Sequence, residues 1–222
     1  MDIDIPKKIK VSPLWCQVKD TLENEIIYHR IPPGSYIKDT VLAKQFGVSR
    51  GPIREALLCL QNEGWVEFKH NYGVYVKEPN PEEITQVLEV RQMVESRSAQ
   101  LAAKRITQEQ LDELENILWQ SKRANEEKDY ELVVELNNQF HGLIVKATQN
   151  TVLQKIHEQY LKKVAWYLTV VIRESVELQA VKEHELLLQA LRDRDSERAI
   201  NILSKHNETT LDLIMASLNE KE

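Results

Sequence analysis

Proline and glycine almost vanish from the last two thirds of this 222-residue chain. Between residues 82 and 222 there is one glycine, Gly142, and no proline. Both residue types interrupt helices, because proline removes a backbone donor and glycine costs about 1 kcal/mol relative to alanine. This long stretch therefore predicts an all-α antiparallel bundle. We expect its six helices at about 81–104, 107–127, 129–148, 150–172, 176–193 and 195–219.

The first 78 residues follow a different pattern, with frequent helix breakers. Apolar residues spaced four apart, from Leu14 to Ile26, predict a first helix that ends before Ile31-Pro32-Pro33-Gly34. A second, short helix is expected over about 40–46, with Gly47 after its end. A third should begin after Ser49 as its N-cap and end at Gly64. Its buried face is expected to contain the apolar residues Ile53, Ala56, Leu57 and Leu60.

Beyond Gly64 the apolar period changes from helical to alternating. Residues 65–69 and 74–77 alternate like strands, and 70–73 fit the turn between them. Two helices joined by a tight turn and followed by a hairpin predict a winged helix-turn-helix. Pro79-Asn80-Pro81 is a stiff linker, so we expect one domain over 1–78 and a second, helical domain over 79–222.

The overall composition is typical of a cytoplasmic globular protein. Charged residues make up 29% and hydrophobic residues 42%. The chain contains no apolar run of about 18 residues, and its first residues lack the apolar core of a secretory signal. Cys16 and Cys59 have no second cysteine at a metal or redox spacing, which favours free thiols buried on helices.

The net charge of -6 is distributed unevenly along the chain. Residues 1–78 hold 11 basic and 10 acidic side chains, and the remainder holds 18 and 25. An acidic second domain repels phosphates, so DNA binding is expected at one end only. A nearly neutral first domain cannot hold DNA by its overall charge. We therefore expect affinity to rest on a few placed contacts, doubled by dimerisation.

The start of the third helix has the residues of a DNA-reading surface. Arg50 and Arg54 are four apart, so both can point outward while Ile53 and Leu57 point into the core. A guanidinium binds guanine O6 and N7 in bidentate fashion. Lys44 on the preceding helix, and Lys69 with His70 at the wing, could reach phosphates. The alternative is that both arginines are ordinary surface charges, paired with Glu55 or Asp39.

Three stretches of the first domain carry a family resemblance: Leu42-Ala43-Lys44-Gln45-Phe46-Gly47-Val48-Ser49-Arg50-Gly51-Pro52-Ile53-Arg54-Glu55-Ala56-Leu57, Gly64-Trp65-Val66 and Gly73-Val74-Tyr75-Val76. Together they closely resemble the GntR family of bacterial transcription regulators. The resemblance implies a dimer on a pseudo-palindromic operator, usually a repressor released by a small effector. The family's DNA contacts fall here on Ser49, Arg50, Gly51, Arg54 and His70, with Asn71 beside them. Thr40 stands where some members have a DNA-contacting arginine.

Three histidines of the helical domain lie where they could meet. Asn137 and His141 share one helix face, and His184 and His206 lie on the last two helices, which antiparallel packing would bring together. Imidazoles that project from facing helices can build a metal site, and three of them suit Zn²⁺ or Ni²⁺. Equally, a lone histidine on an amphipathic helix is often an ordinary core or surface residue. His157, beside charged residues, is expected at the surface.

The helical domain resembles the FCD ligand-binding domain, in its shorter six-helix form. The resemblance rests on Arg91-Gln92-Met93-Val94-Glu95, Asn137-Asn138-Gln139-Phe140-His141, Glu183-His184-Glu185 and Lys205-His206. It implies a divalent metal held by an aspartate and three histidines, which helps to hold a small carboxylate effector. His141, His184 and His206 match the three histidines. Asn137 stands at the aspartate position and brings no negative charge.

Arg91 and Arg173 are the candidates to bind an effector carboxylate, because guanidinium groups do so in bidentate fashion. Arg91 also lies four residues before Glu95, so an intrahelical ion pair is its simpler role.

Three functions remain open at this point. The first is a dimeric, ligand-responsive transcription regulator, and the second is a metalloenzyme with Glu95 or Glu183 as its base. The third is a constitutive DNA-binding protein whose bundle only dimerises. The metalloenzyme would leave the first domain without a purpose.

Overall fold

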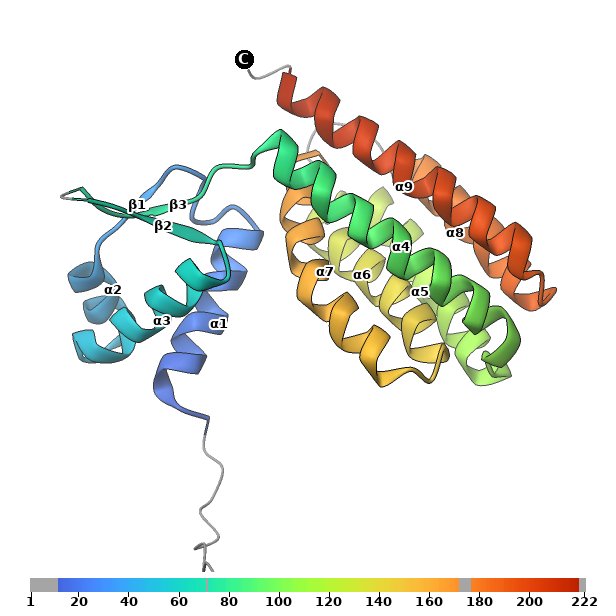
Figure 1. The fold of residues 1–222 in the computed structure, drawn as a ribbon, viewed down its shortest axis with the longest axis horizontal. Coiled ribbons are helices and arrows are strands. Elements are labelled where there is room, and N and C mark those ends of the chain that lie inside the picture. The colour runs from blue at the N-terminus through green and yellow to red at the C-terminus, as the bar shows by residue number, and fades with distance from the viewer. Residues whose placement is uncertain (1–11, 71, 172–176, 220–222) are drawn as a thin grey trace, which may run out of the picture. The chain divides into compact units, whose positions relative to one another are not determined.

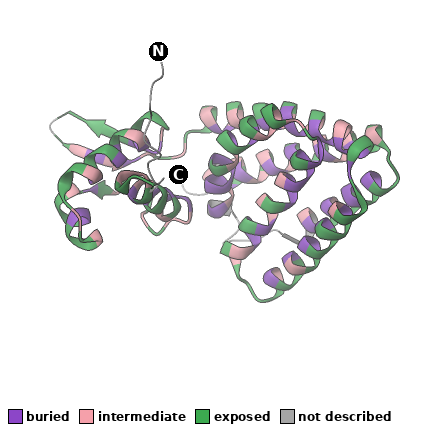
Figure 2. Ribbon diagram, turned by 90° about the horizontal axis from the view of Figure 1, so that it is seen from below, coloured by how far each residue is buried: buried purple, intermediate pink, exposed green. Residues whose placement is uncertain are grey.

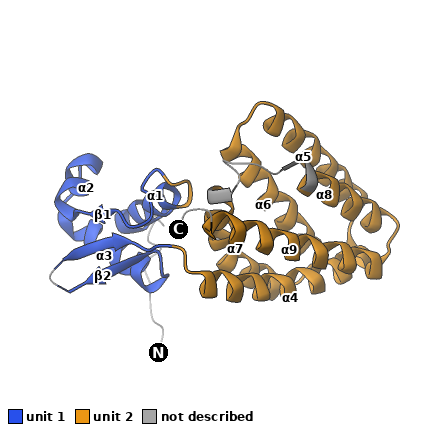
Figure 3. Cartoon of the chain, turned by 90° about the horizontal axis from the view of Figure 1, so that it is seen from above, with its two compact units in different colours: residues 1–26, 30–78 blue, residues 27–29, 79–222 orange. Residues whose placement is uncertain are grey.

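The computed structural model describes residues 12–70, 72–171 and 177–219 (Figure 1). The chain divides into two compact units, residues 1–26 with 30–78 and residues 27–29 with 79–222 (Figure 3). The fold is mainly helical, with one small sheet in the first unit, which confirms the predicted fold class.

The first unit is a winged helix-turn-helix. Its helices are α1 (Leu14–Ile27), α2 (Asp39–Phe46) and α3 (Arg50–Asn62), and its strands are β1 (Tyr36–Ile37), β2 (Val66–Lys69) and β3 (Gly73–Val76). The predicted buried face of α3 is confirmed, since Ile53, Ala56, Leu57 and Leu60 are all buried. On α1, Val18, Leu22 and Ile26 are buried but Leu14 is exposed.

The turn between α2 and α3 sets the direction in which α3 leaves. Gly47 has φ 65° and ψ 30°, the left-handed conformation that a side chain disfavours. Its N–H bonds to carbonyl groups of the last turn of α2, which ends the helix. Ser49 has the extended N-cap backbone of α3, as predicted, but its side chain makes no capping hydrogen bond.

The sheet has the order β1-β3-β2, and both pairings are antiparallel. The hairpin of β2 and β3 was predicted, whereas β1 was not, because two residues are too short to show alternation. β1 pairs through Tyr36 with Tyr75, and the Tyr36 ring lies against the start of the wing. A Cβ at Gly73 would stand 2.5 Å from this ring, so the position has no room for a side chain.

The second unit is the predicted six-helix bundle. Its helices are α4 (Pro81–Arg105), α5 (Gln108–Glu126), α6 (Tyr130–Ala147), α7 (Thr151–Val171), α8 (Glu177–Arg192) and α9 (Ser196–Asn219). Two local signals place the first helix boundaries. Asn80 caps α4 by accepting hydrogen bonds from the amides of Glu82 and Glu83, and Thr107 forms a capping box with Gln110 at α5.

The bundle buries one face of each helix in a shared core (Figure 2). α4 packs against α6, α7 and α9, and α8 packs against α5 and α9. Most of the core is aliphatic, and it also contains Phe140 of α6. The core also encloses charged and imidazole side chains, namely Arg91, Glu95, His141, His157, His184 and His206. Because buried charges are costly unless they are paired, these six side chains need partners inside the bundle.

Neither cysteine is bonded or deeply buried. Cys16 and Cys59 are free and half-buried, so the prediction of free thiols is confirmed while that of full burial is wrong. Among the helices that the structure describes, none is long and apolar enough to cross a membrane.

Candidate metal centre and nucleic-acid interface

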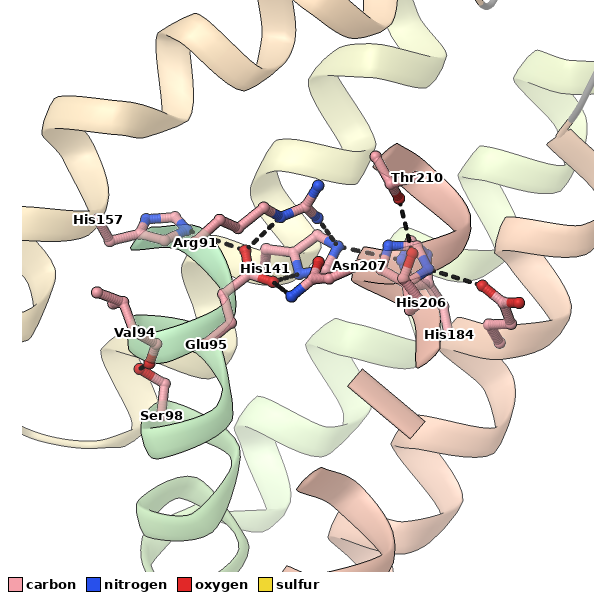
Figure 4. Close-up of polar contacts among 11 residues, drawn as sticks. Arg91, Val94, Glu95, Ser98, His141, His157, His184, His206, Asn207 and Thr210 are labelled. Atoms are coloured by element: carbon pink, nitrogen blue, oxygen red, sulfur yellow. Dashed lines mark hydrogen bonds and ion pairs between the residues drawn. The ribbon is translucent and has the colours of Figure 1, made fainter. Parts of the chain in front are cut away.

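Three histidines from three different helices meet inside the bundle. His141 lies on α6, His184 on α8 and His206 on α9, and all three are buried. Each offers a ring nitrogen, and these nitrogens lie within 4.8 Å of one another. The Nε2 atoms of His141 and His184 are 3.2 Å apart (Figure 4). Two nitrogens bound to one tetrahedral zinc ion stand about 3.3 Å apart, so this spacing fits a shared metal ligand set.

Carboxylates orient two of the three rings. His141 Nδ1 lies 3.3 Å from Glu95 Oε2, and His206 donates through Nδ1 to Glu183 Oε2 at 2.8 Å. A carboxylate on Nδ1 fixes the tautomer and leaves the Nε2 lone pair available. Each carboxylate therefore holds a ring in position. The metalloenzyme hypothesis had proposed the same two residues as bases.

Burial favours the uncharged form of two of the three rings. It lowers the pKa of His141 to about 4, and it holds the pKa of His184 well below the ordinary 6.5, where neighbouring His206 and His141 lower it further. Neutral imidazole is the form that binds a metal ion. Both rings are therefore ready to act as ligands at neutral pH without losing a proton.

Arg91 on α4 contacts this cluster directly. Its Nε donates to Glu95 Oε1 at 3.0 Å, and its Nη2 lies 3.1 Å from His141 Nε2. Burial alone would raise the pKa of Glu95, but the Arg91 guanidinium and the contact with His141 hold it well below its usual value. The predicted ion pair thus exists, and it is fully buried. Among the described residues nothing accepts a hydrogen bond from Arg91 Nη1.

His157 also belongs to this network, so the expectation that it lies at the surface is wrong. Only 3% of it is exposed, and its Nε2 is 3.9 Å from Glu95 Oε1. The charged residues that flank it in sequence lie on other faces of α7 and are exposed. The spacing of His157, Tyr160 and Val164, which all face the core, is the signal that could have revealed its burial.

The remaining predicted ligand and effector residues are less closely tied to the cluster. Asn137 lies one turn before His141 on α6 and is half-buried, and its buried Nδ2 has no partner among the described residues. Arg173 lies outside the described residues. Asn207, which the sequence did not single out, donates to Glu95 Oε2 at 3.3 Å.

The predicted DNA-reading residues all lie on the surface of the first unit. Ser49, Arg50, Gly51, Arg54, Lys44 and His70 are exposed. Both arginines point to one carboxylate oxygen: Asp39 Oδ2 accepts from Arg50 Nη2 at 2.7 Å and from Arg54 Nε at 3.1 Å. The pairing with Asp39 that the sequence suggested is therefore present, and the pairing alone does not decide between a surface charge and a DNA contact. This pairing holds both guanidiniums side by side at the start of α3.

Comparisons with known proteins agree with this architecture. The model for "Bacterial regulatory proteins, gntR family" matches residues 15–76, and the model for the FCD domain matches residues 86–209. The chain belongs to the GntR family. It is a DNA-binding transcription regulator with a C-terminal FCD domain, and its relatives are regulators rather than enzymes.

Several relatives of this GntR regulator cover much of its length. The chain is 30% identical over 151 residues to the uncharacterized regulator YdhC of Bacillus subtilis, which covers 67% of each protein. It is 25% identical to the Escherichia coli regulator McbR, over 96% of this chain and 97% of McbR. The E. coli repressor RspR is 30% identical over 61% of this chain and 59% of its own length.

A solved structure shows the same fold over nearly the whole chain. The structure of E. coli McbR/YncC superposes with a TM-score of 0.81 at 24% identity, covering 94% of this chain and all of that one. Within the FCD domain of this GntR regulator, the buried three-histidine cluster is consistent with the metal site typical of such domains.

Proposed function

We propose that this GntR regulator is a cytoplasmic homodimeric repressor, and that a small carboxylate bound beside a metal ion in the FCD domain controls its operator affinity. The observation that carries the proposal is the cluster of three buried histidines, one of which, His141, contacts a buried arginine. Nitrogen ligands of this kind suit Zn²⁺ or Ni²⁺, and a guanidinium suits a carboxylate. A relative named as a repressor, RspR, supports the direction of control.

At the DNA end, Arg50 and Arg54 would read base edges in the major groove. Ser49 and Gly51 would lie along the backbone, with Lys44 and His70 reaching phosphates. The Asp39 carboxylate would give up its two guanidinium partners to guanine acceptors on binding. Since the first domain has nearly no net charge, one copy alone should bind weakly. A second copy on a pseudo-palindromic operator would supply the missing affinity.

At the effector end, His141, His184 and His206 would hold the ion, with Asn137 as an uncharged fourth ligand. The ion would supply positive charge that fixes one carboxylate oxygen. Arg91 would bind the carboxylate from α4, and Arg173 is a second candidate. Effector binding would then bias the relative placement of the DNA-reading heads in the dimer, which is a coupling between distinct sites.

The DNA interface and the metal site are tested by separate variants. The operator for the DNA test is selected from random DNA. Arg50→Ala should abolish operator binding in a gel-shift assay and leave circular dichroism unchanged. Arg123→Ala, which removes an exposed and paired arginine of the bundle, is the control. Unchanged operator affinity of Arg50→Ala would contradict the assignment of the DNA interface.

For the metal, added Zn²⁺ should raise the melting temperature of the metal-free protein. His184→Ala should abolish this rise, whereas His70→Ala, on the exposed wing, should preserve it. A protein that retains no metal after dialysis and shows no Zn²⁺ response in any variant would exclude the metal site. Sedimentation of the full chain tests the dimer.

A further inference from the structure

We propose that Arg91 and Asn137 make metal binding at the three-histidine cluster dependent on an anion. Arg91 competes with the metal ion for His141, and Asn137 leaves the charge of the ion unbalanced. A carboxylate removes both obstacles, so metal and carboxylate bind cooperatively. This inference rests on the proposed function and adds to it the regulation of the same site.

The competition follows from the hydrogen bonds of His141. Its Nδ1 faces the Glu95 carboxylate at 3.3 Å, which places the proton of the neutral ring on Nδ1, so Nε2 carries the lone pair. Arg91 Nη2 lies 3.1 Å from that Nε2 and donates to it. One lone pair can accept this hydrogen bond or bind a metal ion, but not both. A metal ion must therefore displace the guanidinium from His141.

Displacement leaves Arg91 short of acceptors. The side chain is 2% exposed, and its Nη1 already has no partner among the described residues. Once Nη2 leaves His141, only the Nε bond to Glu95 remains. An unsatisfied buried donor costs about 1–3 kcal/mol, and more if it is charged. A carboxylate offers two oxygens in the planar geometry that Nη1 and Nη2 require.

The charge balance points the same way. Among the described residues, the charged groups in contact with the cluster are Arg91, Glu95 and Glu183, and a histidine that binds a metal ion does so in its neutral form. Their charges sum to about one negative, so a divalent cation would leave the site with one excess positive charge. Excess charge in a buried site is costly. An aspartate at position 137 would neutralise it, whereas Asn137 cannot, and the anion supplies the missing charge.

The test is the Zn²⁺ affinity of the metal-free full chain, measured by competition with a chromogenic chelator. Excess acetate or lactate should tighten Zn²⁺ binding by about tenfold or more, within the usual range of coupling between sites. Acetamide, which has the shape of acetate without its charge, should leave the affinity unchanged. Equal Zn²⁺ affinity with acetate and with acetamide would overturn the inference.

Asn137→Asp isolates the charge. This variant should bind Zn²⁺ about tenfold or more tightly without any carboxylate, and acetate should then tighten binding less than it does in the wild type, because only the Arg91 competition remains. Asn138→Asp adds the same charge one residue along α6, at another half-buried amide, and should keep the dependence of the wild type. If Asn137→Asp binds Zn²⁺ no more tightly than the wild type, the charge argument is wrong.

Arg91→Met isolates the competition. It removes the guanidinium and retains a long apolar side chain, so Zn²⁺ should bind more tightly without acetate, and acetate should lose its effect. Far-ultraviolet circular dichroism checks that the bundle of Arg91→Met has folded. If it has not, the Zn²⁺ affinity of Asn137→Asp tests the inference in its place. Absence of Zn²⁺ binding under every condition would refute the metal site itself. Zn²⁺ binding that is unaffected by acetate would refute only the dependence on a carboxylate.

Discussion

The buried pair of Arg91 and Glu95 allows a sharp prediction of stability, because the bundle contains a matched exposed pair. Arg91 Nε is 3.0 Å from Glu95 Oε1, and Arg123 Nη2 is 3.0 Å from Glu127 Oε1. Both pairs are four residues apart with arginine first. The buried side chains are each 2% exposed, whereas the side chains of the other pair are 57% and 61% exposed.

Glu95→Gln should lower the free energy of unfolding of the bundle by about 3–5 kcal/mol, the usual cost of leaving a buried charge unpaired. The amide also replaces one acceptor oxygen with a donor, which would then face His141 Nδ1 or Asn207 Nδ2. Glu127→Gln should cost less than about 0.5 kcal/mol, because water solvates both partners there. Removing both buried charges, with Arg91→Met and Glu95→Gln together, should restore most of the lost stability.

The assay is urea denaturation of the metal-free protein, followed by far-ultraviolet circular dichroism. Chelator is present throughout, so that metal binding does not contribute to stability. A loss below about 1 kcal/mol for Glu95→Gln would refute the reasoning, since the carboxylate would then not be balancing a buried guanidinium. A loss in the double variant as large as the sum of the single losses would contradict the pairing itself.

Two further predictions concern Asp39 and acid stability. Asp39→Asn should reduce the ratio of specific to non-specific DNA affinity several-fold, because the arginines lose the carboxylate that orients them and the surface gains positive charge. Fluorescence anisotropy on operator and scrambled duplexes at one salt concentration would measure this ratio. Equal changes in affinity for both duplexes would contradict the prediction. The metal-free protein should lose stability as the pH falls from about 6.5 towards 4. Burial lowers the pKa of His141 from 6.5 to about 4, so within this window only the unfolded chain takes up the proton, at a cost of up to about 1.4 kcal/mol per pH unit. Urea titrations near pH 7 and pH 5 would measure the loss, and His141→Asn should reduce it, while buried His184 keeps its own contribution.

Local signals in the sequence were enough to predict both units. The rarity of glycine and proline after residue 82 predicted the bundle, and Gly47 predicted the turn before α3. Such features act within one helical turn, so they can be read without knowing the rest of the chain. β1 was missed for the same reason, because a strand of two residues is stabilised only by its partner, β3.

The sequence by itself determined the helices, and it offered the exposed start of α3 as the candidate DNA-reading face and the three histidines as candidate ligands. Only the tertiary structure decided that His157 is buried and that Glu95 and Glu183 hold the imidazoles. It alone placed Arg91 on the ligand nitrogen of His141. Spacing along a helix fixes which residues share a face. Which residues of other helices meet that face depends on how the bundle packs, and the charge and hydrogen-bonding partners of a buried group follow from that packing.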